Sequence, residues 1–283
     1  MAYEVECKDV TYTYPLSKKP AIKNLNLKLE RGKLYGVIGE NGSGKTTLCS
    51  ILRGFAPSFY KGSISGEILI QGKPLSSYDD QISRKIGYVF QNLFTQISGI
   101  KSTVFEEVAY GLENFGVPVD EIERKVVDIM EMTDIMDLAE KSPFELSGGQ
   151  MQRVALASVI VLDPEILIID EPTSQLDPQS TESVFKIIKK LKERGKTIIL
   201  IEHKIDLLAE YSDEIIVLHN SQVIKMGEAR HVLSDLSLRE YGIKLPQVTL
   251  LAEKLREAGM KIDELPITKK QALDLIEEQR AQQ

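Results

Sequence analysis

The first forty residues alternate between apolar and polar positions in a pattern that predicts antiparallel β-strands. Tyr3, Val5 and Cys7 share one face of a first run, and Ile22, Leu25, Leu27 and Leu29 form a second run. Alternation with a period of two is typical of strands that bury one face. Residues 33–38 are more evenly apolar and predict a further strand, after which Leu48, Ile51 and Leu52 follow at helical spacing.

Beyond residue 60 the apolar runs predict an alternating series of strands and helices. Strands are expected within residues 66–72 and 84–90 and at 166–169, 197–201 and 214–218, with a helix over 180–194 and a short helix after residue 201. Such alternation implies a largely parallel sheet. Because the carboxyl ends of parallel strands meet at one edge, we expect Gly39, Gln91, Asp170 and His203 to lie at that edge.

Two regions depart from this alternation. Residues 102–162 lose the strand pattern, and Val104, Val108 and Leu112 stand at helical spacing, which predicts a helical insertion. In residues 231–283 a helix is expected that ends at Gly259, and residues 268–271 (TKKQ) are typical of a capping box that opens a last helix. We therefore divide the chain into residues 1–230, which include the insertion, and a C-terminal helical extension over residues 231–283.

Composition and charge limit the possible partners. The chain has 283 residues, is 42% hydrophobic and carries a net charge of −7, which argues against general affinity for nucleic acid or anionic lipid. Cys7 and Cys49 form no CxxC, so we expect reduced, buried thiols. The N-terminus is charged where a secretory signal is apolar, and the longest apolar run, residues 154–162, is far shorter than the roughly 20 residues of a membrane-spanning helix. These features predict a cytoplasmic protein.

Residues 39–46, GENGSGKT, match the pattern GxxxxGK[ST] between a predicted strand and a predicted helix, which is the context that the motif requires. Its glycines let the backbone turn tightly, so that amide N–H groups and the helix dipole surround phosphate oxygens. We expect Lys45 to reach the β- and γ-phosphates and the Thr46 hydroxyl to take one position on an octahedral Mg²⁺. The alternative is a glycine-rich turn that carries a lysine by chance.

Two further motifs suggest chemistry. The apolar strand at 166–169 runs into Asp170, which we expect to organise the Mg²⁺ shell, and Glu171, which points the other way and is expected to polarise an attacking water. Ser147, followed by two glycines, precedes a predicted helix, and this makes a second anion site. Taken alone, the first motif is also compatible with an acidic turn and the second with an ordinary helix cap.

These motifs resemble, in their order along the chain, those of the ATP-binding-cassette (ABC) ATPases over residues 3–230. The correspondences are Tyr14 with the adenine-stacking aromatic residue, residues 39–46 with the Walker A loop, Gln91 with the Q-loop, residues 146–150 with the signature sequence, residues 166–171 with the Walker B strand, residues 174–177 with the D-loop and His203 with the switch histidine. The resemblance implies an α/β fold with a P-loop NTPase (RecA-like) core, an antiparallel β subdomain, a helical subdomain that carries the signature motif and a small C-terminal helical extension.

The resemblance also implies that ATP and Mg²⁺ are held between two subunits, the Walker A loop of one facing the signature motif of the other. The nucleotide-binding residues so implied are Tyr14, Gly39, Asn41, Gly42, Ser43, Gly44, Lys45, Thr46, Thr47, Ser147, Gly148, Gly149, Gln150 and Asp177. Catalytic roles fall on Glu171, His203, Lys45 and Gln91, and the metal ligands are Thr46, Gln91 and Asp170. Outside this context, His203 and Gln91 would be ordinary polar residues at strand ends.

A finer resemblance is to the ATPase subunits of energy-coupling-factor importers, which bring vitamins or transition-metal ions into prokaryotic cells. It rests on residues 89–92 (VFQN), Gln96, residues 108–114 (VAYGLEN) and the extension after residue 230, which in that group helps to hold two ATPases together. The chain departs from the pattern where Leu93, Phe94 and Thr95 replace Pro-Asp-Asn and where Gln175 replaces the usual alanine of the D-loop. The apolar residues Leu93, Phe94, Ile97 and Ile100 suit contact with a coupling helix of a membrane partner, or else belong to the core of the insertion.

We therefore expect an ATPase that powers uptake of a vitamin or transition-metal ion at the cytoplasmic face of a prokaryotic membrane. Its expected partners are an integral membrane coupling subunit, a substrate-binding membrane subunit and an identical or paralogous ATPase. Two alternatives stay open: an ATPase of an exporter or lipid-release system, and a soluble ABC ATPase that acts on nucleic acid or ribosomes. The acidic charge and the lack of a long coiled-coil insertion weigh against the nucleic-acid alternative.

Overall fold

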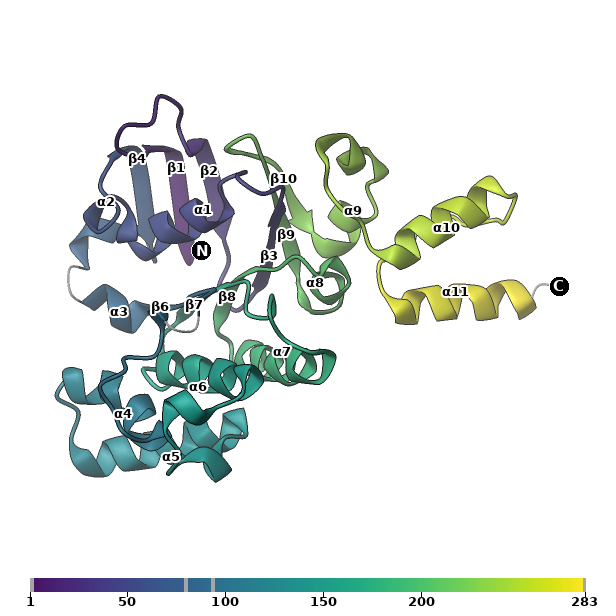
Figure 1. Cartoon of the computed structure of the whole chain (residues 1–283). Coiled ribbons are helices and arrows are strands. Elements are labelled where there is room, and N and C mark those ends of the chain that lie inside the picture. Colours follow the sequence, from purple (N-terminus) through teal and green to yellow (C-terminus); the bar gives the residue numbers. More distant parts are fainter. Residues whose placement is uncertain (1–2, 79–80, 93–94, 282–283) are drawn as a thin grey trace.

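The computed structural model describes residues 3–78, 81–92 and 95–281, and within them the strands form two sheets (Figure 1). The smaller sheet is antiparallel and has the strand order β2-β1-β4-β5. Its strands are β1 (Val5–Thr13), β2 (Ile22–Leu29), β4 (Ser63–Ile70) and β5 (Lys73–Pro74). The antiparallel strands predicted from the alternation in the first thirty residues are confirmed.

The larger sheet has the strand order β10-β9-β3-β8-β7-β6. Its strands are β3 (Leu34–Gly39), β6 (Ile86–Val89), β7 (Ile166–Asp170), β8 (Thr197–Ile201), β9 (Glu214–His219) and β10 (Gln222–Glu228). All neighbours are parallel except β10, which runs antiparallel to β9. The parallel sheet is confirmed, and β7 and β8 are buried along their whole length because both faces of the sheet are covered.

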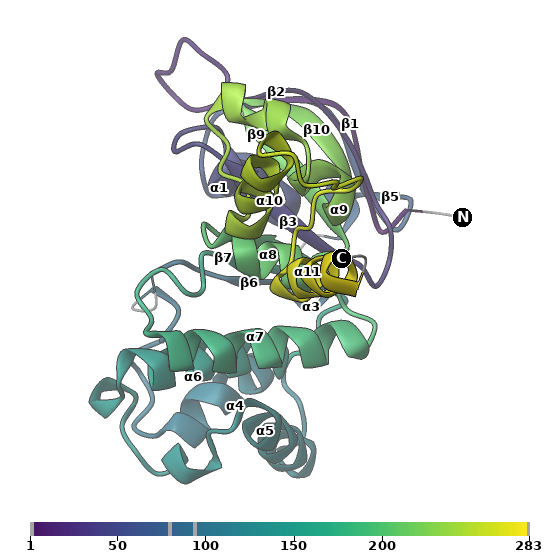
Figure 2. The ribbon, with the colours of Figure 1, turned by 90° about the vertical axis from the view of Figure 1, so that its right-hand side faces the viewer.

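Helices connect the strands and extend the chain at its C-terminal end. They are α1 (Lys45–Arg53), α2 (Phe55–Ser58), α3 (Ile82–Lys85), α4 (Val104–Asn114), α5 (Val119–Thr133), α6 (Gly148–Ile160), α7 (Pro178–Glu193), α8 (Ile205–Tyr211), α9 (Ala229–Leu233), α10 (Gln247–Glu257) and α11 (Lys269–Ala281). The inserted helices α4, α5 and α6 lie together at one end of the molecule in Figures 1 and 2, with α7 between them and the rest. A capping box on Thr103 and Glu106 begins α4.

The apolar side chains of β7 divide between two cores. Leu167 and Ile169 pack into a cluster that continues into the helical insertion, whereas Ile166 and Ile168 face the cluster shared with the antiparallel sheet. The period of two in a strand sends successive side chains to opposite faces, so one uniformly apolar strand serves both cores. The large sheet therefore contributes one face to the core shared with the antiparallel sheet and the other face to the core that includes the helical insertion.

The apolar residues that follow Gln91 have different environments. Ile97 is 7% exposed and lies in the main core cluster, which includes the insertion helices, as in the alternative considered above, whereas Ile100 is 70% exposed. Leu93 and Phe94 lie outside the described residues. Glu107 holds this segment, because its buried carboxylate accepts hydrogen bonds from the amide and the hydroxyl of Ser98, each at 2.7 Å.

The C-terminal helices α10 and α11 project from the body (Figure 1). The predicted end of the first helix is confirmed, because Gly259 lies just past α10 with a φ of 98°. The predicted start of the last helix is also confirmed, because Thr268 and Gln271 form the reciprocal bonds of a capping box at α11. The boundary at residue 230 stays a prediction. Between the body and α10, however, several side chains lie in the main core: Val232, Leu233, Leu238, Ile243 and Leu245.

Candidate functional site

The glycine-rich loop lies where it was predicted, between the end of β3 and the start of α1. Gly44 has a φ of 109°, and a Cβ atom there would lie 2.6 Å from the carbonyl oxygen of Ala21, so only glycine fits this position. The ammonium group of Lys45 turns back over the loop and donates to the carbonyl oxygens of Gly39 and Glu40 at 2.8 and 3.1 Å. The loop thus encloses its own lysine at the carboxyl edge of the sheet.

A pocket of about 510 Å³ opens above this loop. It is lined by Tyr14, Ala21, Asn41, Gly42, Gly44, Lys45, Thr46, Thr47, Gln91, Glu171 and His203. Every lining residue except Ala21 was predicted as a site residue. The lining comes from the connection between β1 and β2, the loop before α1, the first turn of α1 and the segments that follow β6, β7 and β8, as expected for a ligand site at the carboxyl edge of a parallel sheet.

Glu171 connects the two polar strand-end residues of this pocket. Its Oε2 accepts a hydrogen bond from Nε2 of Gln91 and its Oε1 contacts Nε2 of His203, each at 2.7 Å. Glu171 has a φ of 49°, a left-handed conformation that costs a non-glycine residue about 1–3 kcal/mol and that often occurs at functional sites. Its amide still donates to the carbonyl of Ile201 at 3.0 Å, so the backbone is held by β8 while the side chain turns into the pocket.

Asp170 lies beneath this pair and is 3% exposed. Its Oδ2 accepts a hydrogen bond from the hydroxyl of Tyr88 at 3.1 Å, and its Oδ1 is buried without a hydrogen-bond partner. Burial raises the pKa of Asp170, while the hydrogen bond from Tyr88 and the nearby hydroxyl of Thr46 act in the opposite direction. An orphaned carboxylate oxygen beside a threonine hydroxyl fits Mg²⁺, which takes few protein ligands and completes its shell with phosphates and water. Accordingly, the described residues contain no group of three or more histidine, cysteine, aspartate or glutamate side chains that could hold a metal alone.

The floor of the pocket suits a polyanion. Lys45 is only 7% exposed, and this burial lowers its pKa, while Glu171 and Asp170 oppose the shift. The hydroxyl of Ser43 is buried with no hydrogen-bond partner. Bound phosphate would supply an acceptor for that hydroxyl and a counter-charge for the ammonium group, so the present residues fit the phosphates of a nucleotide.

Tyr14 borders the pocket and Tyr12 does not. The ring of Tyr14 packs edge-on against Tyr12, with centroids 4.9 Å apart, and its hydroxyl is hydrogen-bonded to that of Thr47 at 3.1 Å. Tyr12 is fully buried, and its hydroxyl donates to the carbonyl oxygens of Tyr60 and Lys61. Of the two neighbouring tyrosines, only Tyr14 is available to a ligand.

The remaining predicted residues lie together but outside this pocket. Ser147 caps α6 in a reciprocal capping box with Gln150, as predicted. Asp177 caps α7 by accepting from the amide and hydroxyl of Ser180 at 2.9 and 2.6 Å. Any Cβ on Gly149 would lie 2.3 Å from the Ser180 hydroxyl, so the starts of α6 and α7 touch. The two sets of candidate residues therefore form two separate surfaces of one chain.

Sequence reasoning missed the residues that support the site. Glu202 is 3% exposed, and its carboxylate accepts from the amides of His203 and Lys204 and from the Thr173 hydroxyl. Tyr88, which orients Asp170, was also missed. One available signal was that Glu202, like Asp170, directly follows a run of four apolar residues at the edge where the site lies.

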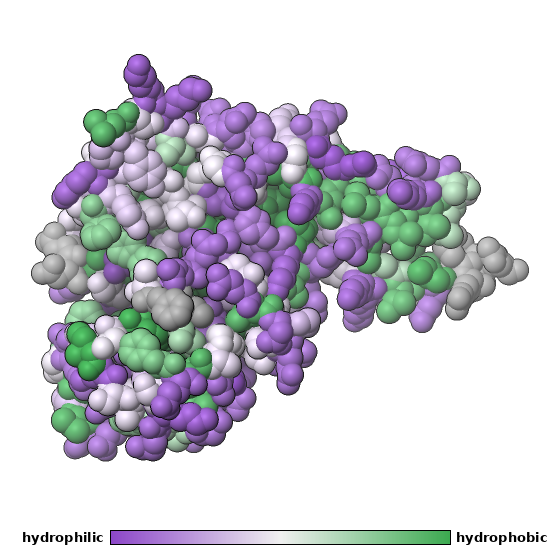
Figure 3. All heavy atoms as spheres, in the orientation of Figure 1, coloured by the Kyte–Doolittle hydropathy of each residue, from purple (hydrophilic) through white to green (hydrophobic). Residues whose placement is uncertain are grey.

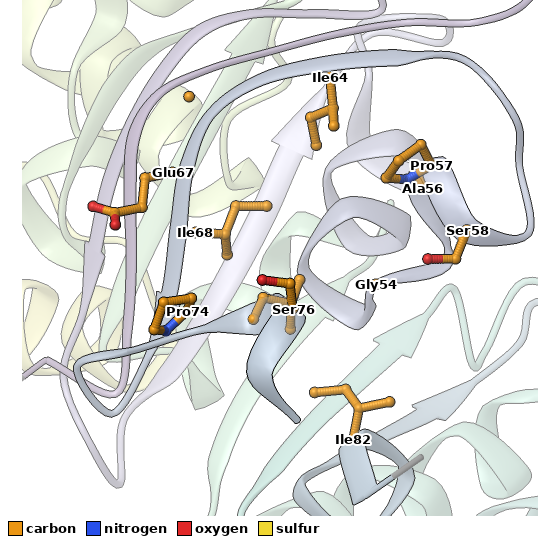
Figure 4. Close-up of a pocket in the computed structure, with 12 residues that line it drawn as sticks. Gly54, Ala56, Pro57, Ser58, Ile64, Glu67, Ile68, Pro74, Ser76 and Ile82 are labelled. Atoms are coloured by element: carbon orange, nitrogen blue, oxygen red, sulfur yellow. The ribbon is translucent and has the colours of Figure 1, made fainter. Parts of the chain in front are cut away.

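A larger pocket, of about 710 Å³, lies away from all these residues, between β4, α2 and α3 (Figure 4). Its lining is about equally polar and apolar, and the apolar side chains include Ile64, Ile68, Leu75 and Ile82. Glu67 is its one ionisable lining residue, and that side chain is paired with Lys8 at 3.0 Å. Without cationic groups or a glycine-rich loop, this pocket is unsuited to phosphate.

Comparison with known proteins identifies the family. The sequence profile described as "ABC transporter" matches residues 22–174, which is more than half of the chain. The chain belongs to the ABC transporter family. As an ABC protein it is an ATPase that couples ATP hydrolysis to transport, and its fold is the P-loop NTPase fold that was predicted.

Relatives and solved structures add detail. The energy-coupling factor transporter ATP-binding protein of Streptococcus sanguinis is 36% identical over 93% of this ABC protein and 96% of its own length. The structure of CbiO1 from Clostridium perfringens, part of the ABC transporter complex CbiONQ, superposes with a TM-score of 0.75 at 32% identity and covers 89% of this chain and 100% of its own. A dimeric ATP-binding cassette bound to ADP and Pi in a post-hydrolysis state has a TM-score of 0.68 at 30% identity, over 80% of this chain and 99% of its own.

Proposed function

We propose that this ABC ATPase powers the uptake of a micronutrient, a vitamin or a transition-metal ion, through an energy-coupling-factor-type membrane transporter. The similarity to the Streptococcus sanguinis protein supports the proposal, because a match over 93% of the chain necessarily extends into residues 231–283. The likeness to CbiO1 also points to this group of transporters. Among described residues, no helix is long and apolar enough to cross a membrane.

The hydrolytic assignment rests on one observation: Glu171 bridges Gln91 and His203 on the wall of the pocket that also contains Lys45. In this assignment Lys45 and the amides of the glycine-rich loop bind the phosphates. Glu171 orients and polarises the attacking water, and His203 lies beside the γ-phosphate.

The other pocket residues are assigned to binding. Tyr14 would stack on the adenine, and Thr46, Asp170 and Gln91 would hold Mg²⁺, which would supply positive charge beside the phosphates. The buried Oδ1 of Asp170, which has no hydrogen-bond partner, supports this ligand set. Thr46 and Gln91 line the same pocket as Lys45.

The second surface, at Ser147 to Gln150, requires another copy of the chain or a paralogue. These residues lie at the N-terminus of α6, outside the pocket that contains Lys45. Two anion-binding half-sites on one chain are complete only when each meets its complement on a second chain. We assign Asp177 and the signature residues Ser147, Gly148, Gly149 and Gln150 to nucleotide held by the partner.

The C-terminal extension is proposed to strengthen this pairing. It projects from the body, and apolar residues gather on its surface in Figure 3. Its exposed apolar side chains include Leu251 and Leu273, which are 53% and 60% exposed. A projecting apolar surface suits contact with a second ATPase subunit.

A membrane subunit is proposed to bind near the segment after Gln91. Ile100 and Phe144 are 70% and 60% exposed, and Gly99 lies against the Phe144 ring. This apolar surface adjoins both the Gln91 segment and the loop that leads to Ser147, so a coupling helix bound there would sense both half-sites. The protein would then work at the cytoplasmic face of the membrane.

Affinity purification of the tagged full-length chain from detergent-solubilised membranes tests this function. We expect an integral scaffold subunit and a separate substrate-binding membrane subunit to co-purify with it, and ATP to stimulate uptake by the reconstituted complex. Recovery of a large two-domain permease would favour an exporter or lipid-release system instead, and recovery of ribosomes or nucleic acid would refute a transport role. A Lys45→Ala variant should recover the same partners but give no ATP-driven uptake.

A further inference from the structure

Glu202 is the most buried carboxylate that the assigned mechanism leaves unused beside the pocket. It is 3% exposed, and its Oε1 accepts from the amides of His203 and Lys204 at 2.8 and 3.1 Å. Its Oε2 accepts from the hydroxyl of Thr173 at 2.6 Å, and Thr173 is itself fully buried. A buried carboxylate is costly unless its oxygens are bonded, and here three donors converge on it.

These bonds join the two segments that carry the reacting side chains. Thr173 follows Glu171 by two residues, and His203 directly follows Glu202. One carboxylate therefore fixes the backbone after Glu171 and the backbone of His203 to a common point. The result is visible in the site, where the side chains of Glu171 and His203 stand 2.7 Å apart.

Lys204 adds a second connection to the same place. Its ammonium group donates to the carbonyl oxygen of Thr173 at 3.2 Å and to the Thr181 hydroxyl in α7 at 2.9 Å. Thr173 is thus held at its hydroxyl by Glu202 and at its carbonyl by Lys204. The strand end that carries His203, the turn after Glu171 and the first turns of α7 form one hydrogen-bonded unit.

We propose that Glu202 is a positioning residue for ATP hydrolysis, which sets the imidazole of His203 against the carboxylate of Glu171. The proposal rests on the function proposed above for His203. Glu202 contacts neither the pocket nor any reacting atom; it acts through the backbone of the loop that carries His203. Displacement of a catalytic group by about 1 Å can lower a rate about a hundredfold, so loss of this anchor should reduce turnover without weakening ATP binding.

Steady-state kinetics of full-length variants test the proposal. We expect Glu202→Ala to lower kcat about tenfold or more and to leave the KM for ATP within about twofold. Glu202→Gln retains an oxygen that can accept both backbone amides, so most of kcat should return. Thr173→Val is nearly isosteric and removes only the hydroxyl contact, so it should show a smaller fall in kcat even if Glu202→Ala folds poorly.

Asp213 supplies the matched control. Its carboxylate accepts from the Leu34 amide and from Lys192 at 2.8 and 2.7 Å, but it lies at the amino ends of β3 and β9, the opposite edge of the sheet. Asp213→Ala should lower the melting temperature and leave kcat unchanged. If Glu202→Ala and Thr173→Val also lower only the melting temperature, Glu202 is merely structural and the proposal is wrong.

A His203→Ala background separates this inference from the proposed function. If Glu202 acts through His203, Glu202→Ala should lower kcat no further once His203 is alanine. A full additional loss in that background would overturn the positioning role. Wild-type turnover by His203→Ala itself would instead refute the role of His203, and with it the assigned mechanism.

Discussion

Replacing Glu171 by glutamine tests the assigned chemistry most directly. The substitution keeps the shape of the side chain and removes its charge. In the present geometry, the amide oxygen of a glutamine can still accept from Gln91, and its NH₂ group can donate to Nε2 of His203 when that nitrogen is unprotonated. Both contacts therefore survive in neutral form, and we expect the free energy of unfolding to change by about 1–2 kcal/mol at most.

The expected loss is in the rate. A positioned general base contributes about 10²- to 10⁴-fold, which corresponds to about 3–5 kcal/mol of transition-state stabilisation. ATP affinity should stay near that of the wild type, because phosphate binding is assigned to Lys45 and the loop amides rather than to Glu171. Because bound ATP is not cleaved in this variant, the paired form of the subunits should also accumulate.

Three measurements on Glu171→Gln check this expectation: phosphate release, ATP binding by calorimetry, and molecular mass by light scattering with ATP present. Glu182→Gln is a suitable control, since Glu182 is an exposed α7 residue that pairs with Lys186. Phosphate release at the wild-type rate would refute the assignment of Glu171 as the base. Loss of ATP binding in parallel with the rate would show that Glu171 acts in binding instead.

Four further outcomes are expected. Lys45→Ala should lose nucleotide affinity, and unchanged binding by calorimetry would contradict the phosphate-binding role of the loop. Removal of residues 247–283 keeps Val232 and Leu245 in the core but takes Ile267 from the same cluster, so it should lower the melting temperature and weaken pairing while the chain still folds; an unaltered dimer by light scattering would count against the role of the extension. Burial raises the pKa of the Cys7 and Cys49 thiols, that of Cys7 to about 12. Neither thiol should therefore react with an aromatic disulfide reagent near neutral pH until guanidinium unfolds the chain, and prompt reaction of the native protein would disprove this. Burial also raises the pKa of Asp170, so this carboxylate is protonated at a higher pH than an ordinary aspartate, and MgATP affinity should weaken as it is protonated. An Asp170→Asn variant whose MgATP affinity has the same pH profile as the wild type would refute this explanation.

The fold was most predictable where one physical constraint acts on every residue of a segment. β7 and β8 are buried on both faces, so their uniform apolar sequences and the acids that follow them reveal strands and their ends. The strand β10 was not predicted, because it is a largely exposed edge strand whose sequence carries no such pattern. The short α2 was also missed, and its residue Ala56 departs from helical geometry.

Within the candidate site, some residues could be predicted from the sequence and others could not, for a similar physical reason. Residues that must touch a phosphate or a metal occur at fixed spacing, so the glycine-rich loop and the Asp170-Glu171 pair could be predicted from the sequence. Supporting contacts depend on tertiary register. Tyr88 bonds to Asp170 across 82 positions, and Thr173 bonds to Glu202 across 29. No local pattern encodes such pairs, because they arise only when neighbouring parallel strands align.

The same register explains how the two half-sites of one chain can be connected. Lys204, next to His203, bonds to Thr181 in α7, and the neighbouring Ser180 touches Gly149 at the start of α6. Thus α7 contacts both the segment beside the Lys45 pocket and the surface that we propose to face the partner's nucleotide. A shift of the His203 segment reaches the signature residues only if α7 moves as a rigid element. Thr181→Val should then loosen cooperation between the two sites of a dimer while leaving ATP affinity at each unchanged, and full cooperativity in that variant would exclude this route.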